Sequence, residues 1–361
     1  MKPKVLLIQQ VIPSYRLPIF NLLAEQVDLT VVYESGAAPK NALFQTKQVK
    51  TFRIPRLGKV YRGGLKRLTS GYDVVINSID TPAYAVKRLG RLKRKHFGLV
   101  HWGIGVSASY SSTFDAADAD ASFYESVLRE SDACLFYSDY PVKKYAAQGW
   151  PAEKLFVAQN TVLVERDETP RARDTLLFLG SLYPQKGFDE LLEQYALAVS
   201  QDPRVPKLVI IGDGSEKNRI EAWIAEHQLQ ERITLTGAIF DDAVLGRYFS
   251  AAVACVSPNQ AGLTVLKSMG CGVPYITRRD AITGGELFNI THGVNGVLYD
   301  RPEELKAILL DLTEHPETYM LYGRNARAHY EANRKPEDML AGFLAAIAYA
   351  GAQRQKREGN G

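Results

Sequence analysis

The sequence lacks several features that would set its class directly. No run of about 18 apolar residues is present, so no segment is expected to span a membrane as a helix. The short apolar run near the N-terminus is too short for a signal peptide and predicts a first strand. Only three cysteines occur, Cys134, Cys255 and Cys271, and they lack the close spacing of a metal site. Their odd number predicts buried structural thiols in a reducing cytoplasm, with no metal expected.

Length and composition describe a globular chain of more than one domain. The 361 residues are 46% apolar, 10% aromatic and 23% charged, which excludes disorder, collagen and a coiled coil for the whole chain. Such a length exceeds one ordinary domain and suits two of about 150–180 residues each.

The positive charge is unevenly distributed. Lys plus Arg minus Asp plus Glu is 44 − 40 = +4. Residues 47–95 hold 14 basic and 2 acidic residues, a net charge of +12, which leaves 30 − 38 = −8 for the rest. We therefore expect a basic face on the N-terminal half, for an anionic membrane surface or a phosphorylated acceptor, with an ordinary solvated face as the alternative. Nucleic acid is not expected, because no nucleic-acid-binding motif accompanies the charge.

Apolar strand patterns alternate with amphipathic helical patterns in two successive series. The expected strands are Val5–Ile8, Leu29–Tyr33, Val74–Asn77, Gly98–His101, Ala133–Tyr137 and Leu155–Ala158, then Thr175–Gly180, Leu208–Gly212, Ile233–Thr236, Val253–Ser257, Pro274–Thr277 and Gly296–Tyr299. The expected helices are Pro18–Val27, Pro82–Arg94 and Tyr140–Gln148, then Phe188–Ser200, Ser215–His227, Asp242–Phe249, Leu263–Cys271 and Pro302–Leu312. Nearly continuous apolar strands between helices indicate parallel sheets covered on both faces. The fold class predicted is α/β, with two doubly wound Rossmann-like domains.

The polar stretch Glu165–Asp174 is the expected linker. It divides the chain into a domain of residues 1–164 and a domain of residues 165–335. A last helix over 336–352 is expected to return to the first domain, and Gln353–Gly361 is expected to fray. Ligands bind at the carboxyl ends of parallel strands, so a cleft between the two sheets is the expected site.

Three segments of the second half suit a bound phosphate. In the first, a strand ends at Gly180 and Ser181, and Lys186 precedes a second glycine and a helix. Backbone amides and a lysine in this order can hold a diphosphate, although a surface turn with a solvated lysine has the same pattern. In the second, a strand ends at Gly212 and Asp213, where a simple turn is the alternative. The third segment carries Asn259, Gly262, Leu263, Thr264 and Lys267 after a strand and around the start of a helix.

In this order and spacing, the three segments resemble the second half of glycosyltransferase family 4, which has the GT-B fold. That family carries Gly-Arg-Leu-x-x-x-Lys-Gly, then Ile-Gly-Asp-Gly-Pro, then a glycine-rich segment with two glutamates. The resemblance is firm from about Leu155 to Leu312 and includes Val294–Leu298. It is looser in Ile12–Phe20, His101–Gly105 and Lys154–Asn160, which look like a bacterial surface-polysaccharide subgroup.

Two departures from the family pattern concern the donor site. Ser181 stands where the family usually has an arginine for the diphosphate, and Asn259 and Lys267 occupy the positions of the two glutamates. Glu286 is a candidate substitute acid, with a solvated glutamate at a helix start as the alternative.

The resemblance implies a retaining sugar transfer that needs no bound metal and no cofactor. It also implies that Gly237 and Ala238 approach the nucleotide base. His101, at a strand end beside two glycines, is expected to face the cleft as a catalytic residue, with a packed histidine as the alternative. Tyr15 and Arg16, on the loop after the first strand, are further candidates for donor or acceptor contacts.

The sequence therefore predicts a cytoplasmic glycosyltransferase, peripheral on the inner face of the plasma membrane. Its second domain would bind a nucleotide-diphosphate sugar, and its first a glycan acceptor, expected to be lipid-linked, in surface polysaccharide synthesis (lipopolysaccharide or capsule). Two alternatives remain: a non-catalytic partner of an active transferase, and a sugar-nucleotide epimerase, which needs cleft carboxylates that the sequence does not display.

Overall fold

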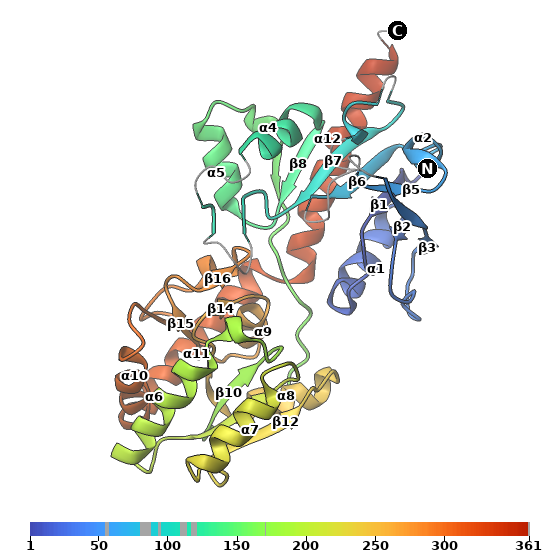
Figure 1. Cartoon of the computed structure of the whole chain (residues 1–361). Coiled ribbons are helices and arrows are strands. Elements are labelled where there is room, and N and C mark those ends of the chain that lie inside the picture. The colour runs from blue at the N-terminus through green and yellow to red at the C-terminus, as the bar shows by residue number, and fades with distance from the viewer. Residues whose placement is uncertain are drawn as a thin grey trace. The chain divides into compact units, whose positions relative to one another are not determined.

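The computed structural model describes residues 1–54, 58–79, 88–92, 95–108, 114–116, 121–169 and 171–359 (Figure 1). The chain forms two compact units. Unit 1 comprises Met1–Ser107, Asp115–Thr161 and Lys335–Gly361, and unit 2 comprises Ala108–Phe114 and Val162–Arg334. Apart from the segment Ala108–Phe114, the chain passes from unit 1 to unit 2 at residue 162 and returns at residue 335.

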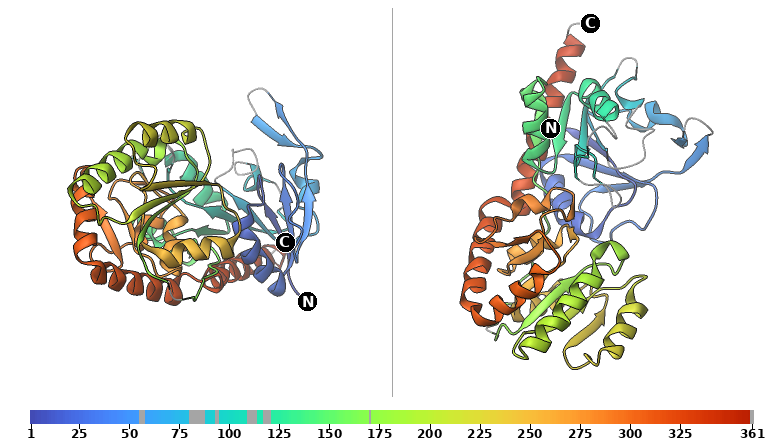
Figure 2. Two further views of the ribbon diagram at one scale, coloured as in Figure 1. Left: turned by 90° about the horizontal axis from the view of Figure 1, so that it is seen from below. Right: turned by 60° about the vertical axis from the view of Figure 1, so that its left-hand side comes forward.

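A seven-stranded sheet of order β3-β2-β1-β6-β7-β8-β9 forms the centre of unit 1. All its strands pair in parallel. They are β1 (Lys4–Ile8), β2 (Asp28–Tyr33), β3 (Gln45–Gln48), β6 (Val74–Ser78), β7 (Gly98–Gly103), β8 (Ala133–Phe136) and β9 (Leu155–Val157). Strands β6, β7 and β8 are buried throughout, because helices cover both faces of the sheet (Figures 1 and 2).

The helices of unit 1 include the last helix of the chain. They are α1 (Leu17–Gln26), α2 (Gly64–Leu68), α4 (Ala121–Glu130), α5 (Asp139–Ala147) and α12 (Pro336–Gly359), with the 3-10 turns η1 (Ser14–Arg16) and η2 (Ala152–Lys154). Helices α1 and α12 pack together on one face of the sheet, where Ile19, Phe20, Phe343 and Ile347 join the core. The expected helix Pro82–Arg94 lies mostly outside the described residues.

The expectation that Gln353–Gly361 frays is wrong for most of this segment, because α12 continues to Gly359. Arg354 forms an ion pair with Asp73, and Arg357 forms one with Asp132. These pairs attach the last turns of α12 to unit 1, an effect that the polar composition of the segment did not reveal.

A β-hairpin that the sequence did not predict follows β3. Strands β4 (Thr51–Ile54) and β5 (Gly58–Tyr61) pair antiparallel. Strand β3 is itself an edge strand and is exposed along its whole length. Strands β3 to β5 escaped prediction because these short segments lack a long apolar or alternating pattern.

Unit 2 contains a six-stranded parallel sheet of order β12-β11-β10-β13-β15-β17. These strands are β10 (Thr175–Leu179), β11 (Lys207–Ile211), β12 (Ile233–Gly237), β13 (Ala252–Val256), β15 (Tyr275–Arg278) and β17 (Gly296–Tyr299). The two-residue strands β14 (Gln260–Ala261) and β16 (Ile282–Thr283) pair with each other beside it.

Helices again cover both faces of this sheet (Figure 2). They are α6 (Phe188–Gln201), α7 (Lys217–Glu226), α8 (Asp242–Ala251), α9 (Thr264–Gly270), α10 (Glu304–Glu314) and α11 (Pro316–Asn333), with η3 (Pro184–Lys186) and η4 (Glu286–Asn289). Helix α11 was not predicted, because its few buried positions form only a narrow apolar stripe among many polar residues. The predicted α/β class, with two doubly wound parallel sheets, is confirmed.

All three cysteines are buried free thiols. Burial raises the pKa of Cys134 to about 11 and the pKa values of Cys255 and Cys271 to about 12. Within the described ranges, no helix has the length and apolarity to cross a bilayer. The same residues contain no cluster of His, Cys, Asp or Glu arranged to hold a metal ion.

Candidate functional site

Three loops of unit 2 meet where β10, β11 and β13 end. Gly180 follows β10, and its N–H donates to the carbonyl of Ile211, the last residue of β11, at 3.0 Å. The N–H of Leu182 donates to the carbonyl of Asp213 at 2.9 Å. The loop after β13 joins through Thr264, whose hydroxyl donates to the carbonyl of Leu179 at 3.3 Å. The three segments that the sequence singled out therefore lie against one another.

Close backbone packing explains two glycines of this meeting point. A methyl group on Gly212 would collide with the carbonyl oxygen of Gly180, and one on Gly214 would collide with the carbonyl of Leu182. Ser181 and Asp213 are exposed beside these contacts. The loops can approach this closely only because the positions carry no side chain.

Lys186 is the cation at this meeting point. It ends the turn η3, and a methyl group on Gly180 would lie 3.0 Å from its Nζ. Burial lowers the pKa of Lys186 to about 8. No carboxylate pairs with this ammonium within the described ranges, and the ring centroid of Phe178 lies 5.9 Å from Nζ. A partly buried cation without a counter-ion favours the binding of an anion. The solvated lysine that the sequence left open is not what the structure contains.

The next residue, Gly187, connects this turn to Asn259. Gly187 has φ +74°, and a methyl group there would lie 2.8 Å from Cγ of Asn259. Asn259 belongs to the loop after β13, so the Lys186 turn rests directly on the third segment. Gly262 has open space in front of it, and Leu263 and Thr264 lead into α9.

Lys267 is held away from solvent by an acidic partner that the sequence did not reveal. It is 9% exposed on α9, and its Nζ forms an ion pair with Asp242 at the start of α8. The charge of Lys267 is thereby balanced inside the protein. No local pattern could indicate this pair, because its members lie 25 residues apart.

Glu286 is 5% exposed, so the solvated alternative for this residue is wrong. Its Oε2 accepts hydrogen bonds from the N–H of Gly284 at 2.9 Å and from the hydroxyl of Thr283 at 3.3 Å. These donors hold the carboxyl group against its own loop.

Gly237 and Ala238 lie at the end of β12. The carbonyl of Gly237 accepts from the N–H of Gly212 at 2.9 Å, which places this strand end beside the second segment. Gly237 has φ +78°, and no atom lies within 4 Å of where its Cβ would be. The backbone is therefore open to a ligand at this point.

A further group at the carboxyl ends of the strands escaped the sequence analysis. The hydroxyl of Tyr299, on β17, donates to Oε1 of Glu190 at 2.6 Å. Nη1 of Arg278, at the end of β15, lies 3.4 Å from the other oxygen of the same carboxylate. Burial and the neighbouring Glu190 raise the pKa of Tyr299 well above its usual value. These residues are 88 and 109 positions apart from Glu190, so only the fold brings them together.

In unit 1, His101 is fully buried in the middle of the sheet. It lies on β7, with Asn77 and Cys134 as its neighbours on the adjacent strands. Its Nδ1 lies 2.6 Å from the hydroxyl oxygen of Ser131. This environment favours the packed alternative for His101 over direct contact with a ligand.

Arg16 is 3% exposed and lies among aromatic rings. Its guanidinium carbon lies 5.1 Å from the ring centroids of Trp102 and Tyr137 and 5.2 Å from that of Tyr15. Its Nη1 contacts the sulfur of Met339, on α12, at 3.3 Å. Cation–π contacts of this kind fix the loop after β1 to the sheet and to α12. Tyr15, with 42% of its surface exposed, is the more accessible of the two candidates.

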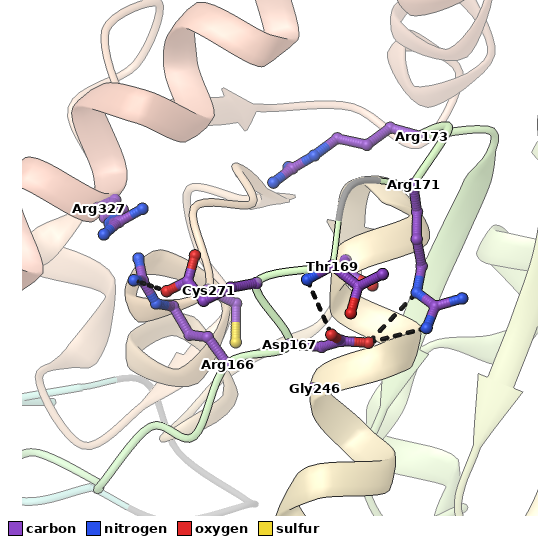
Figure 3. Close-up of a pocket in the computed structure, with 10 residues that line it drawn as sticks. Arg166, Asp167, Thr169, Arg171, Arg173, Gly246, Cys271 and Arg327 are labelled. Atoms are coloured by element: carbon purple, nitrogen blue, oxygen red, sulfur yellow. Dashed lines mark hydrogen bonds and ion pairs between the residues drawn. The ribbon is translucent and has the colours of Figure 1, made fainter.

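A separate cavity of about 210 Å³ lies at the opposite, amino-terminal end of the unit 2 strands (Figure 3). Its arginines are already engaged. Arg171 pairs with Asp167, and Arg166 pairs with Glu168. Nη1 of Arg173 donates to the carbonyl of Gly272 at 2.8 Å. Because the cavity lies away from the three loops, we treat it as separate from the candidate site.

Comparison with known proteins identifies the part of the chain that contains these loops. Residues 164–329 match the family described as glycosyl transferases group 1. The chain is 21% identical over 219 residues to an alpha-monoglucosyldiacylglycerol synthase of Acholeplasma laidlawii, covering 59% of this chain and 52% of the relative. It is 27% identical over 187 residues to a D-inositol 3-phosphate glycosyltransferase of Segniliparus rotundus, covering 49% and 41%. The chain thus spans about half the length of the curated relatives it matches.

Solved structures resemble the whole chain. HepE of Anabaena in complex with UDP superposes with a TM-score of 0.71 at 15% identity, covering 96% of this chain and 99% of that one. WaaG, a glycosyltransferase involved in lipopolysaccharide biosynthesis, superposes with a TM-score of 0.65 at 15% identity, covering 95% and 99%. At such low identity the likeness shows the fold alone, and that fold is GT-B.

Proposed function

We propose that this protein is a retaining glycosyltransferase that moves a sugar from a nucleoside-diphosphate donor to a glycan acceptor. The observation that carries the proposal is Lys186, a cation with no counter-ion among the described residues, where three loops of the matched region meet. A diphosphate leaving group develops negative charge as the sugar departs, and a fixed cation nearby stabilises it.

In the proposed reaction, the bond between the sugar and the diphosphate oxygen breaks, and the electron pair leaves with the diphosphate. The acceptor hydroxyl attacks the same face of the sugar and gives its proton to the departing phosphate oxygen. Lys186 would hold the phosphates, with Ser181 and Asp213 beside it and with Asn259 and Gly262–Thr264 on the third side. Gly237 and Ala238 would border the base. In this scheme the protein's own cation serves the leaving group, and we propose no metal or cofactor.

We assign the protein to the family 4 members that lack the usual pair of glutamates. The positions of that pair hold Asn259 and Lys267, and the charge of Lys267 is balanced by Asp242. Glu286, which begins η4 after β16, is our candidate for the acid near the donor sugar.

For the acceptor we propose a lipid-linked glycan, handled at the inner face of the plasma membrane during synthesis of a surface polysaccharide. Two comparisons support a lipid-linked acceptor. One relative is named as a synthase of a glucosyldiacylglycerol, and WaaG is described as acting in lipopolysaccharide biosynthesis. Unit 1 would take the acceptor and unit 2 the donor.

A second candidate is a non-catalytic partner of an active transferase. The ion pair of Lys267 with Asp242 favours it, because a salt bridge stands where related enzymes have an acid for the donor. A thermal-shift screen with UDP, GDP and their sugars separates the two. A ligand that binds only the native state raises the melting temperature, and turnover should then follow with a glycan acceptor. Binding without any hydrolysis or transfer would support the non-catalytic partner, and no binding would contradict the proposed donor site.

A further inference from the structure

A shallow cavity of about 250 Å³ on unit 1 is bordered by cations alone among its charged side chains. It lies between β3, the residues that lead into β4, and α2. We call it the basic pocket, defined by Lys47, Lys50, Arg62 and Arg67. Among the residues that the structure describes, no aspartate or glutamate lines it. Over the described part of the chain, none of these four side chains forms an ion pair.

Many arginines elsewhere in the described part of the chain form ion pairs with acidic residues. Arg354 pairs with Asp73 and Arg357 with Asp132 in the same unit. Four like charges around one hollow raise the local electrostatic potential, and an anion that enters the hollow lowers it. The basic pocket therefore suits an anionic group such as a phosphate.

The basic pocket also has apolar lining residues. Val49 and Leu68 line it, and both belong to one apolar cluster of unit 1. Gly63 and Gly64 border it, and a Cβ on Gly64 would meet no atom within 4 Å. Lysine and arginine commonly lay their stems on apolar surface while the charged ends reach a polar group.

An exposed aromatic ring belongs to the same surface. Phe52 is 50% exposed on β4. Lys50 directly precedes β4, and the pairing of β4 with β5 continues to it, so the alternation of side chains places Phe52 on the side of Lys50. The N–H of Arg62 donates to the carbonyl of Lys50 at 2.9 Å, so Arg62 stands opposite Lys50 across the hairpin. Cations and an exposed ring on one face are the composition of a surface that meets lipid head groups.

We propose that the basic pocket seats the head-group phosphate of an anionic phospholipid, while Phe52 enters the boundary between head groups and acyl chains. This inference rests on the proposed location at a membrane, and it specifies which residues of unit 1 contact the lipid. Of the other basic residues that the sequence places in this region, Arg56, Lys87, Lys93 and Arg94 lie outside the described residues. Lys66, Arg88, Arg91 and Lys95 are described but do not line the pocket.

The test uses the full chain and sedimentation with vesicles of phosphatidylglycerol mixed with phosphatidylcholine. The pocket variant is Arg62→Gln with Arg67→Gln. The matched control is Arg247→Gln with Arg324→Gln, which removes the same charge from exposed positions of unit 2. Melting temperatures confirm that both variants fold, and calorimetry with UDP measures the donor site independently of the vesicles.

We expect the wild type to bind these vesicles and to ignore vesicles of phosphatidylcholine alone. The pocket variant should lose at least about tenfold in affinity and depend less on salt, while the control stays within about twofold. Phe52→Ser should weaken binding and leave the salt dependence unchanged.

Three results would overturn the proposal. The first is no binding of the wild type to anionic vesicles. The second is an equal loss in the control, which would mean diffuse net charge rather than a pocket. In the third, glycerol 3-phosphate releases the wild type from the vesicles. It also raises the melting temperature of the wild type but not that of the pocket variant. That result would make a soluble phosphate the occupant. If UDP still binds in any of these cases, the proposed donor site is not contradicted.

Discussion

The ammonium of Lys186 lies directly over Gly180: a methyl group on that glycine would lie 3.0 Å from Nζ. The two residues belong to the loop after β10, and nothing larger than hydrogen separates the cation from the strand end. This geometry explains why a glycine and a lysine six residues apart occur together in the first segment.

Gly180→Ala is therefore expected to push Lys186 out of place. The side chain is flexible, so it can move, but it then leaves the position above the strand end. We expect UDP affinity to fall by about threefold to tenfold, because moving the ammonium by a few tenths of an ångström is enough to weaken a charge-assisted contact. The melting temperature should change only slightly. Isothermal calorimetry checks the affinity. An unchanged affinity would mean that the phosphates do not approach the ammonium from this side.

The lowered pKa of Lys186 predicts that donor binding takes up protons. With a pKa of about 8 in the free protein, half of the molecules carry a neutral amine at pH 8. A bound diphosphate favours the charged form and raises the pKa, so binding at pH 8 should take up roughly half a proton, and affinity should fall as the pH rises above 8.

Calorimetry of UDP binding in two buffers of different ionisation enthalpy measures this uptake. Lys186→Arg supplies the control, because arginine stays charged at this pH and adds no uptake. Equal proton uptake in the wild type and in Lys186→Arg would assign the titration to the ligand or to another group.

The ion pair between Lys267 and Asp242 predicts how exchanging the two charges changes the melting temperature. Lys267→Glu alone places two carboxylates together near the protein interior and should lower the melting temperature by several degrees. Adding Asp242→Lys reverses both charges and should restore most of the loss, because the two side chains are in contact. Melting curves of the two single variants and the double variant give the coupling; purely additive losses would argue against the pair.

Burial of His101 predicts a stability effect. His101→Ala removes a fully buried ring that contacts Ser131, and the cavity should cost about 2–4 kcal/mol in the free energy of unfolding. UDP affinity of the folded fraction should stay near that of the wild type, because the ring lies in unit 1. A near-native melting temperature together with a hundredfold loss of transfer would instead restore the catalytic role that the sequence suggested.

Much of the scaffold of the proposed donor site could be predicted from the sequence. The apolar runs gave β10 and β11 within one residue of their observed starts, and the glycines after them marked where loops meet. These features can be predicted from short stretches of sequence, since a strand end requires a turn and a close backbone contact requires glycine.

Other features were beyond sequence reasoning because they depend on tertiary contacts. The pairing of Lys267 with Asp242 and the contact of Gly187 with Asn259 join separate segments. His101 looked accessible because it stood near glycines after an apolar run. The observed strand continues to Gly103, which leaves the histidine inside the sheet.

The most direct test of the donor site is the affinity for UDP of Lys186→Ala beside the control Lys207→Ala at pH 7. Lys207 is an exposed lysine at the amino-terminal start of β11, in the same unit. Loss of a charge-assisted contact costs roughly 1.5–3 kcal/mol, so calorimetry should show at least about tenfold weaker binding for Lys186→Ala and none of this loss for Lys207→Ala. Equal affinity of Lys186→Ala and the wild type, in a protein that melts normally, would contradict the account.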